Sequence, residues 1–132
     1  MRLFLLIGAL STASGALSQT ADDQFNLSCK GTSMTFSGTG PPSAAVPWSR
    51  EFRVDLSERS YCEDACSEVR RLVRISPDEL RFRDDGDEVS YVNRSNGRMT
   101  VVSNAKDAKT YSPTTISATC TRNNFSGFGR KF

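Results

Sequence analysis

The chain has 132 residues with 17 basic and 15 acidic side chains, which give a formal net charge of +2. This length corresponds to one domain, and the near balance of charge gives no reason to expect a nucleic-acid partner. The sequence contains no histidine, which excludes histidine-based nucleophile activation and histidine metal ligands within these residues.

The first 18 residues have the three-part pattern of a secretory signal peptide. Arg2 gives a positive start, an apolar run follows, and small residues precede a cut before Gln19. The apolar run is shorter than the roughly 20 residues that a permanent transmembrane helix needs. We therefore expect a signal peptide at 1–18, with a cut after Gly15 as the alternative. The mature domain at 19–132 is expected to be periplasmic or secreted, with no transmembrane segment after cleavage.

After residue 24, apolar and polar residues alternate in short runs, which is typical of half-buried strands. In chain order, the apolar members of these runs are Phe25, Leu27 and Cys29; Met34 and Phe36; Phe52, Val54 and Leu56; Val69, Val73 and Ile75; Leu80 and Phe82; Val89 and Tyr91; Met99 and Val101; and Ile116, Ala118 and Cys120.

Turn-forming groups separate the runs at residues 38–42, 76–78 and 84–87, and the Asn96-Gly97 pair is a strong hairpin signal. The pattern predicts an all-β fold: a small antiparallel meander of roughly eight strands that closes into a lipocalin-like barrel. A two-sheet β-sandwich is the alternative. An outer-membrane barrel is disfavoured, because the runs are nearer six residues than the 9–11 that such strands need.

Export makes disulfide bonds the expected state of the four cysteines, Cys29, Cys62, Cys66 and Cys120. Cys62 and Cys66 are four residues apart and favour a local bridge. Cys29 lies in the first strand-like run and Cys120 in the last, so their pairing would join the two ends of the fold. A four-cysteine zinc site would need a second close pair, and a redox site usually has two intervening residues.

Several short motifs resemble a family of short exported proteins of alphaproteobacteria that are uncharacterised. They are the segments 25–31 (Phe-Asn-Leu-Ser-Cys-Lys-Gly), 53–56 (Arg-Val-Asp-Leu), 61–66 with its two cysteines, 93–97 (Asn-Arg-Ser-Asn-Gly) and the ending from Cys120 to Phe128. The order and spacing of the motifs carry the resemblance, which implies a source and a compartment but no mechanism. The cysteine-bearing β layout is also similar to periplasmic inhibitors of c-type lysozyme, although no residue here is matched to that family's inhibitory positions.

Arginine residues on the polar faces of the predicted strands form the one candidate binding site. Arg53, Arg81 and Arg83, with Arg70 and Arg74 beside them, could make a cationic face for an anionic partner such as lipopolysaccharide, phosphate or an acidic protein surface. The alternative is a solvated face, in which neighbouring acids such as Glu51 and Glu79 neutralise these arginines.

Three further features have structural interpretations. Residues 84–88 (Asp-Asp-Gly-Asp-Glu) are interpreted as an acidic hairpin tip, because they lack the twelve-residue spacing of an EF-hand calcium loop. Trp48 is expected to plug one end of the core, although an exposed ligand anchor is the alternative. Phe125 and Phe128 are expected to fold back over one end of the barrel.

The sequence offers no evident catalytic group, metal site or cofactor site. Without histidine, a hydrolase would need paired carboxylates or a Ser-Lys pair, and no such pair is evident. We expect a monomeric, non-catalytic exported protein that binds an unknown envelope component or another protein. The alternatives are a periplasmic inhibitor of a cell-wall hydrolase such as lysozyme, or an enzyme of unknown type.

Overall fold

The computed structural model describes residues 22–37, 40–107 and 110–129, so the predicted signal peptide at 1–18 lies outside the described residues. The described chain forms nine strands: β1 (Gln24–Thr35), β2 (Val46–Asp55), β3 (Ser60–Glu63), β4 (Arg70–Arg71), β5 (Arg74–Ile75), β6 (Glu79–Asp84), β7 (Glu88–Asn93), β8 (Arg98–Asp107) and β9 (Thr110–Asn124).

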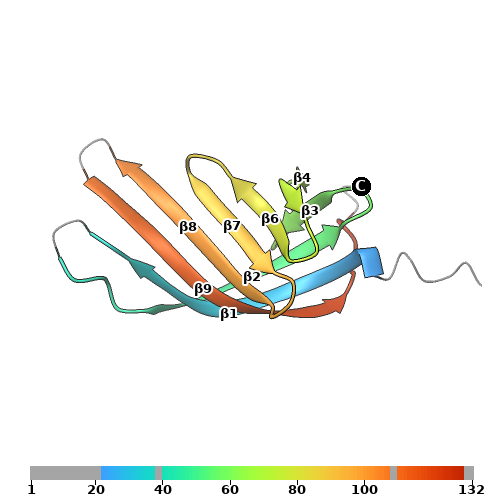
Figure 1. Cartoon of the computed structure of the whole chain (residues 1–132), viewed down its shortest axis with the longest axis horizontal. Helices are drawn as coiled ribbons and strands as arrows, with labels where there is room; N and C mark the ends of the chain where they lie inside the picture. Colours follow the sequence, from blue (N-terminus) through green and yellow to red (C-terminus); the bar gives the residue numbers. More distant parts are fainter. Residues whose placement is uncertain (1–21, 38–39, 108–109, 130–132) are drawn as a thin grey trace, which may run out of the picture.

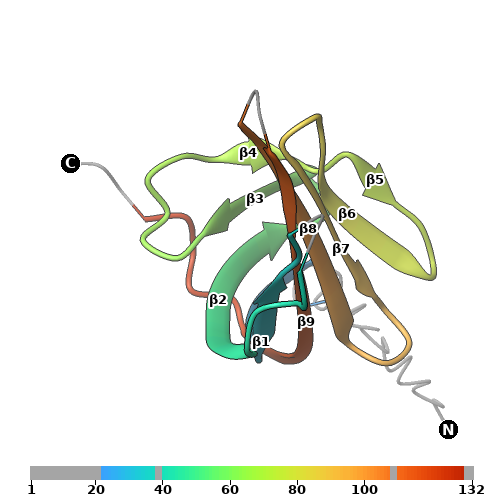
Figure 2. The same ribbon diagram turned by 90° about the vertical axis from the view of Figure 1, so that its left-hand side faces the viewer.

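All nine strands belong to one antiparallel sheet, in the order β4-β3-β2-β1-β9-β8-β7-β6-β5. The sheet curls into a half-barrel (Figures 1 and 2). The predicted all-β, barrel-like fold is therefore confirmed, and the two-sheet sandwich alternative is wrong because the described strands form a single sheet. Within the same residues, no helix is both long enough and apolar enough to cross a membrane.

The first and last strands lie next to each other at the centre of the sheet. β1 pairs with β9 from Phe25 opposite Asn124 to Thr35 opposite Thr114. This register places Cys29 directly opposite Cys120, and the two residues form a disulfide bond. The second bridge joins Cys62 to Cys66, so both disulfides have the pairing expected from the sequence.

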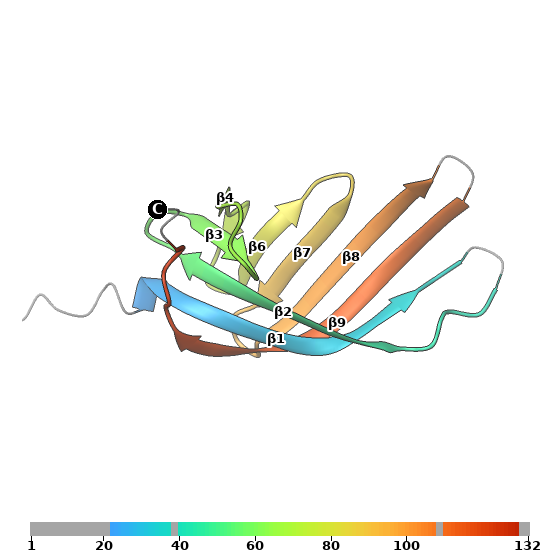
Figure 3. The ribbon, with the colours of Figure 1, turned by 180° about the vertical axis from the view of Figure 1, so that it is seen from behind.

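Four long strands extend beyond the rest of the half-barrel. β1, β2, β8 and β9 have between 10 and 15 residues, whereas β3 to β7 have between two and six. The β1–β2 and β8–β9 hairpins therefore project past the short strands on one side of the molecule (Figures 1 and 3).

A single short segment connects the two edges of the curled sheet, and we call residues 69–75 the strap. Its first half, β4, pairs with β3, and its second half, β5, pairs with β6. The change of partner occurs between adjacent residues: the Leu72 N–H donates to the Arg59 carbonyl, and the Val73 N–H donates to the Arg81 carbonyl. Figure 2 shows β4 and β5 following one another between β3 and β6. This change splits the expected run at 69–75 into two strands. In addition, the expected runs at 25–29 and 34–36 form the single strand β1, and β3 corresponds to none of the expected runs.

Aromatic side chains fill the interior of the half-barrel near the strap. Phe52 stacks on Phe82 with ring centroids 4.4 Å apart, and Tyr61 meets Phe82 edge-on at 5.0 Å. All three are at most 1% exposed. The same core contains aliphatic residues from every long strand, together with Leu72 of the strap and Leu80 of β6. This part of the barrel is therefore packed with side chains.

The alternation predicted for β7 is wrong by one residue. Val89 and Tyr91 were expected to be the apolar face, but Glu88, Ser90 and Val92 are the buried positions. β7 pairs with β8 in unbroken register, with Ser90 opposite Val101 and Val92 opposite Met99. Met99 and Val101 are buried, and residues directly opposite each other lie on the same face of a sheet, so Ser90 and Val92 are buried and Glu88 follows by alternation.

Candidate functional site

The three arginines predicted to form an anion-binding face have different partners. Arg81 contacts Glu79 and Asp84, and its guanidinium lies 5.0 Å from the centre of the Tyr91 ring. Arg83 contacts Asp85 and Glu88. Arg53 donates to the carbonyl of Gly127 in the C-terminal tail. Each arginine thus already has a partner within the chain, and an anion-binding role for them stays a prediction.

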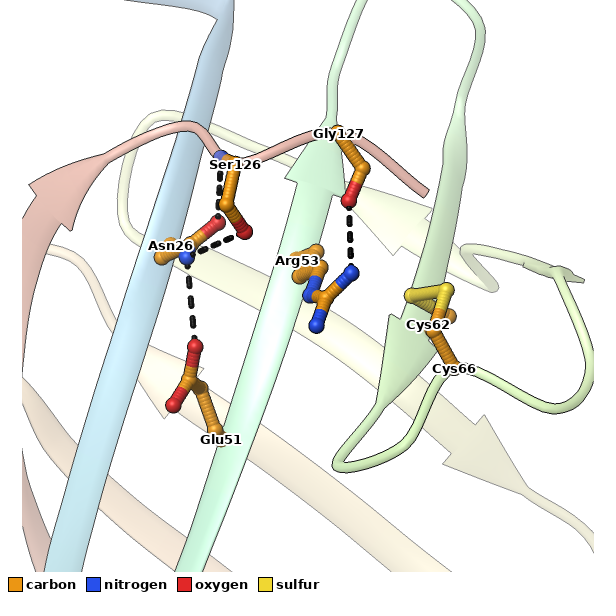
Figure 4. The surroundings of a disulfide bond; sticks show 7 residues. All are labelled: Asn26, Glu51, Arg53, Cys62, Cys66, Ser126 and Gly127. Carbon is orange, nitrogen blue, oxygen red and sulfur yellow. Dashed lines mark hydrogen bonds between the residues drawn. A yellow bond between two sulfur atoms is a disulfide. The ribbon is translucent and has the colours of Figure 1, made fainter. Parts of the chain in front are cut away.

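The C-terminal tail, residues 125–129, lies across β1 and β2, next to Arg53. Asn26 of β1 donates to Glu51 and to the Ser126 hydroxyl, and it accepts a bond from the Ser126 N–H (Figure 4). Phe125 and Phe128 pack edge-to-face with centroids 5.4 Å apart. These contacts fix the tail across β1 and β2, where Arg53 is half-buried.

Four charged residues from different strands form an ionic cluster on the buried side of the sheet. Arg50 of β2 contacts Glu63 of β3 at 3.6 Å and Glu88 of β7 at 3.5 Å. Arg83 of β6 contacts the second oxygen of Glu88 at 3.3 Å. The Arg50 guanidinium also lies 5.1 Å from the centre of the Trp48 ring. Trp48 is partly buried and packs against the core, in agreement with its expected role as a core plug.

The ionic cluster is paired electrostatically but is not fully hydrogen-bonded. Arg50 Nη1, Glu88 Oε2 and the hydroxyl of Ser90 are buried and have no hydrogen-bond partner among the described residues. Burial raises the pKa of Glu63, and the neighbouring Arg50 opposes that rise. Such buried ion pairs add little net stability, because desolvation offsets the attraction. They do strongly disfavour any arrangement of the strands that separates the charges.

A cleft of about 350 Å³ lies where the strap meets the end of β6, and we call it the seam cleft. Its lining residues come from β3, from the strap and the residue before it, and from the end of β6 and the turn that follows: Tyr61, Glu68, Val69, Arg70, Arg71, Val73, Phe82, Arg83, Asp84 and Asp85. Tyr61 and Phe82 are buried and form its floor, whereas Val69 and Val73 are 50% and 52% exposed. The cleft therefore combines a buried aromatic floor with exposed apolar and charged walls.

One hydrogen bond closes the floor of the seam cleft. The Tyr61 hydroxyl donates to the carbonyl of Phe82 at 3.1 Å, so a side chain joins β3 to β6, two strands that are not paired with each other. Burial, followed by the negative charge of Glu63, raises the pKa of Tyr61 to about 12. The phenol is therefore held in its protonated, donating form at neutral pH.

On the walls of the seam cleft, every acid contacts an arginine, but some arginines on and beside the walls contact no acid. Glu68 pairs with Arg70, Asp84 with Arg81, and Asp85 with Arg83. In the described part of the chain, Arg71 on the wall, Arg74 beside it and Arg59 at the strap's contact with β3 form no ion pair. Arg59, Arg71 and Arg74 are exposed, so the strap presents cations that the chain itself does not neutralise.

Sequence reasoning placed Arg70 and Arg74 beside the predicted arginine face but did not single out Arg71. The strand-like run at 69–75 was visible, but nothing in the local pattern indicated that it would cross from one sheet edge to the other. The signal that was available is the local pattern Val-Arg-Arg-Leu-Val-Arg at 69–74, in which only Leu72 is buried.

Two smaller hollows lie elsewhere. One of about 280 Å³ is beside the Cys62–Cys66 bridge and has mostly acidic and small lining residues: Glu63, Asp64, Ala65, Ser67, Glu68 and Arg70. The other, of about 140 Å³, is lined by core residues such as Phe25 and Leu80 and by Arg94 and Arg122. Among the described residues, no group of three or more His, Cys, Asp and Glu side chains is placed to hold a metal ion.

Comparison with protein-family models, with curated proteins and with solved structures finds no match for this chain. The candidate site is therefore assigned from its own geometry.

Proposed function

We propose that this protein is an exported, non-catalytic binding or envelope-accessory protein that recognises its partner through its outer surface. The observation that carries the proposal is the seam cleft, where exposed valines and Arg71, which has no ion pair in the described chain, lie around a buried aromatic floor. The packed aromatic interior supports surface recognition over enclosure of a small ligand, because Phe52, Tyr61 and Phe82 occupy that space.

Two further features support this proposal. The disulfides tie β1 to β9 and fix the loop after β3, so the surface is preorganised and binding costs little ordering entropy. Disulfides also fit an oxidising compartment outside the cytoplasm, in keeping with the predicted signal peptide.

A pull-down of envelope components with the oxidised, exported protein tests the proposal. We expect one or more components to be retained by the wild-type protein and released by salt, because Arg71 on the cleft wall and Arg74 beside it form no ion pair in the described chain. The reduced and alkylated protein, in which both disulfide bonds are broken, serves as the control. Retention that is equal for the two forms, or absent from both, would contradict the proposal.

The hairpin tip between β6 and β7 favours a second candidate, inhibition of a cell-wall hydrolase. Asp85 accepts hydrogen bonds from the N–H groups of Asp87 and Glu88, and Arg83 binds its other oxygen. The tip is thus a rigid, acidic projection of the kind that can enter a binding groove. A lysozyme turbidity assay tests this candidate: unchanged clearing of cell walls at micromolar protein would exclude it.

A further inference from the structure

The seam cleft borders a free strand edge. β4 is a terminal strand of the sheet, so the side of its backbone that faces away from β3 has no neighbouring strand. β5 pairs with β6 only at Leu80 and Arg81, which leaves the rest of β6 without a strand on that side. The lining residues at 69–71 and 82–85 place the cleft between these two unpaired edges. An unpaired edge is a template for an additional strand.

The charges around this edge favour an acidic occupant. Each of the three acids in the lining already contacts an arginine, whereas Arg71 has no ion pair in the described chain. Arg74 adds a second unneutralised cation one residue beyond the lining. Guanidinium groups bind carboxylates through paired hydrogen bonds, so carboxylates on an incoming strand would satisfy them.

We propose that the seam cleft binds an extended acidic segment of a partner protein by adding it as a strand beside β4. The segment's backbone pairs with the free edge, and its carboxylates face Arg71 and Arg74. Its alternate side chains are apolar and contact Val69 and Val73, the exposed valines of the cleft lining. This inference rests on the proposed binding function and names the chemistry of the partner.

The geometry favours an extended peptide over an anionic membrane surface. Side chains of a strand alternate, so one extended segment can present both carboxylates and apolar groups, which matches a cleft lined by exposed valines and by an arginine without an ion pair. A membrane would contact the exposed arginines and valines but would leave the strand edge unused. Strand addition is an established mode of peptide recognition, in which backbone bonds give affinity and side-chain pockets give specificity.

The test uses a capped hexapeptide of alternating glutamate and valine, labelled for fluorescence anisotropy, and the oxidised exported protein at low salt. We expect saturable binding and weaker binding as salt is raised. The same peptide with lysine in place of glutamate should bind at least about ten-fold more weakly, because its charges face Arg71. Peptide methylated at alternate backbone nitrogens should lose binding to a similar extent, because methylation removes the donors that a paired strand needs.

Charge-reversal variants locate the site. Arg71→Glu and, separately, Arg74→Glu should each weaken binding of the glutamate–valine peptide, by about ten-fold for Arg71. Arg98→Glu is the matched control, because Arg98 is an exposed arginine at the start of β8 without an ion pair in the described chain. It makes the same charge change away from the cleft and should leave affinity within about two-fold at moderate salt. Amide chemical-shift changes should be confined to residues 69–71 and 82–84.

Several outcomes would overturn the inference. Equal binding of the lysine peptide or of the methylated peptide would show that neither charge nor strand pairing is involved. Binding to anionic phospholipid vesicles that depends on Arg71, with no binding of the peptide, would assign the surface to a membrane instead. If the pull-down retains a partner equally with wild-type and Arg71→Glu protein, the binding function stands and this site is wrong. The peptide comparisons use wild-type protein, so they remain decisive if a variant fails to fold.

Discussion

Gly31 sets how closely β1 and β9 can approach at one position. A Cβ atom on this residue would lie 1.9 Å from the Ser117 carbonyl oxygen and 2.5 Å from the Ala118 Cα, both of them backbone atoms. We expect Gly31→Ala to destabilise the protein by about 3 kcal/mol or more, because two strands must move apart. Chemical denaturation measures the change. Gly40→Ala, whose Cβ would meet only the Ser37 hydroxyl at 3.4 Å, should have little effect, and equal effects would contradict this account.

Tyr61 should ionise only at high pH, because burial of its phenol raises the pKa. Its pKa is raised to about 12, against an ordinary value near 10 in the unfolded chain. The stabilising contribution of the protonated phenol is therefore complete below pH 10 and is lost as the pH rises from 10 to about 12. Phenolate absorbance during a pH titration should show a late step that Tyr61→Phe removes. A Tyr61→Phe profile identical to wild type would refute the assignment.

The two disulfides close loops of very different length. Cys29–Cys120 spans 91 residues and joins the first strand to the last, whereas Cys62–Cys66 spans four. In the loop-entropy account, their contributions are about 4–5 and about 2 kcal/mol. The double variant Cys29→Ala/Cys120→Ala should therefore melt roughly 10 °C or more below Cys62→Ala/Cys66→Ala. Calorimetry makes the comparison, and a lower melting temperature for the second variant would contradict it.

The strap depends on one anchor. Leu72 is 2% exposed, while the residues on both sides of it are exposed, so this side chain holds the segment that joins the sheet edges. Leu72→Ala should cost about 2–5 kcal/mol and should raise amide hydrogen exchange in β4 and β5 more than in β1 and β9. Val73→Ala is the matched control, because Val73 is 52% exposed and its loss should cost less than about 1 kcal/mol. Uniform exchange across all strands would show that the strap is not a separate unit.

For the molecule as a whole, predicted export can be tested from the mass of the mature protein. The amino-terminal pattern predicts that the mature protein begins at Gln19, or a few residues upstream if the cut follows Gly15. Mass spectrometry of the protein recovered from the periplasm or the medium measures this mass directly. A mature product that retains Met1 would show that the leader is not cleaved and would remove the main reason to expect disulfide formation.

Much of the architecture was available from local patterns. Period-two alternation gave the strands, because burying one face of a sheet requires an apolar residue at every second position. Export and cysteine placement led to both disulfides, since first and last strands that lie side by side bring Cys29 opposite Cys120. The hairpin turn predicted at Asn96-Gly97 is also confirmed. Gly97 adopts φ 70° in the β7–β8 turn, a conformation that glycine accepts without strain.

The sequence by itself therefore determined the fold class, most of the strand positions and the cysteine pairing, because each depends on neighbours along the chain or on a simple alternation. Only the tertiary structure decided which face of β7 is buried, because pairing with β8 sets Ser90 and Val92 opposite the buried Val101 and Met99, and Glu88 gains Arg50 and Arg83 as partners. Only it brought the strap to β6 and created the seam cleft, because the curl of the sheet sets which distant edges meet. The candidate binding site is made of side chains from separate strands, and the curl of the half-barrel sets how far apart these side chains lie.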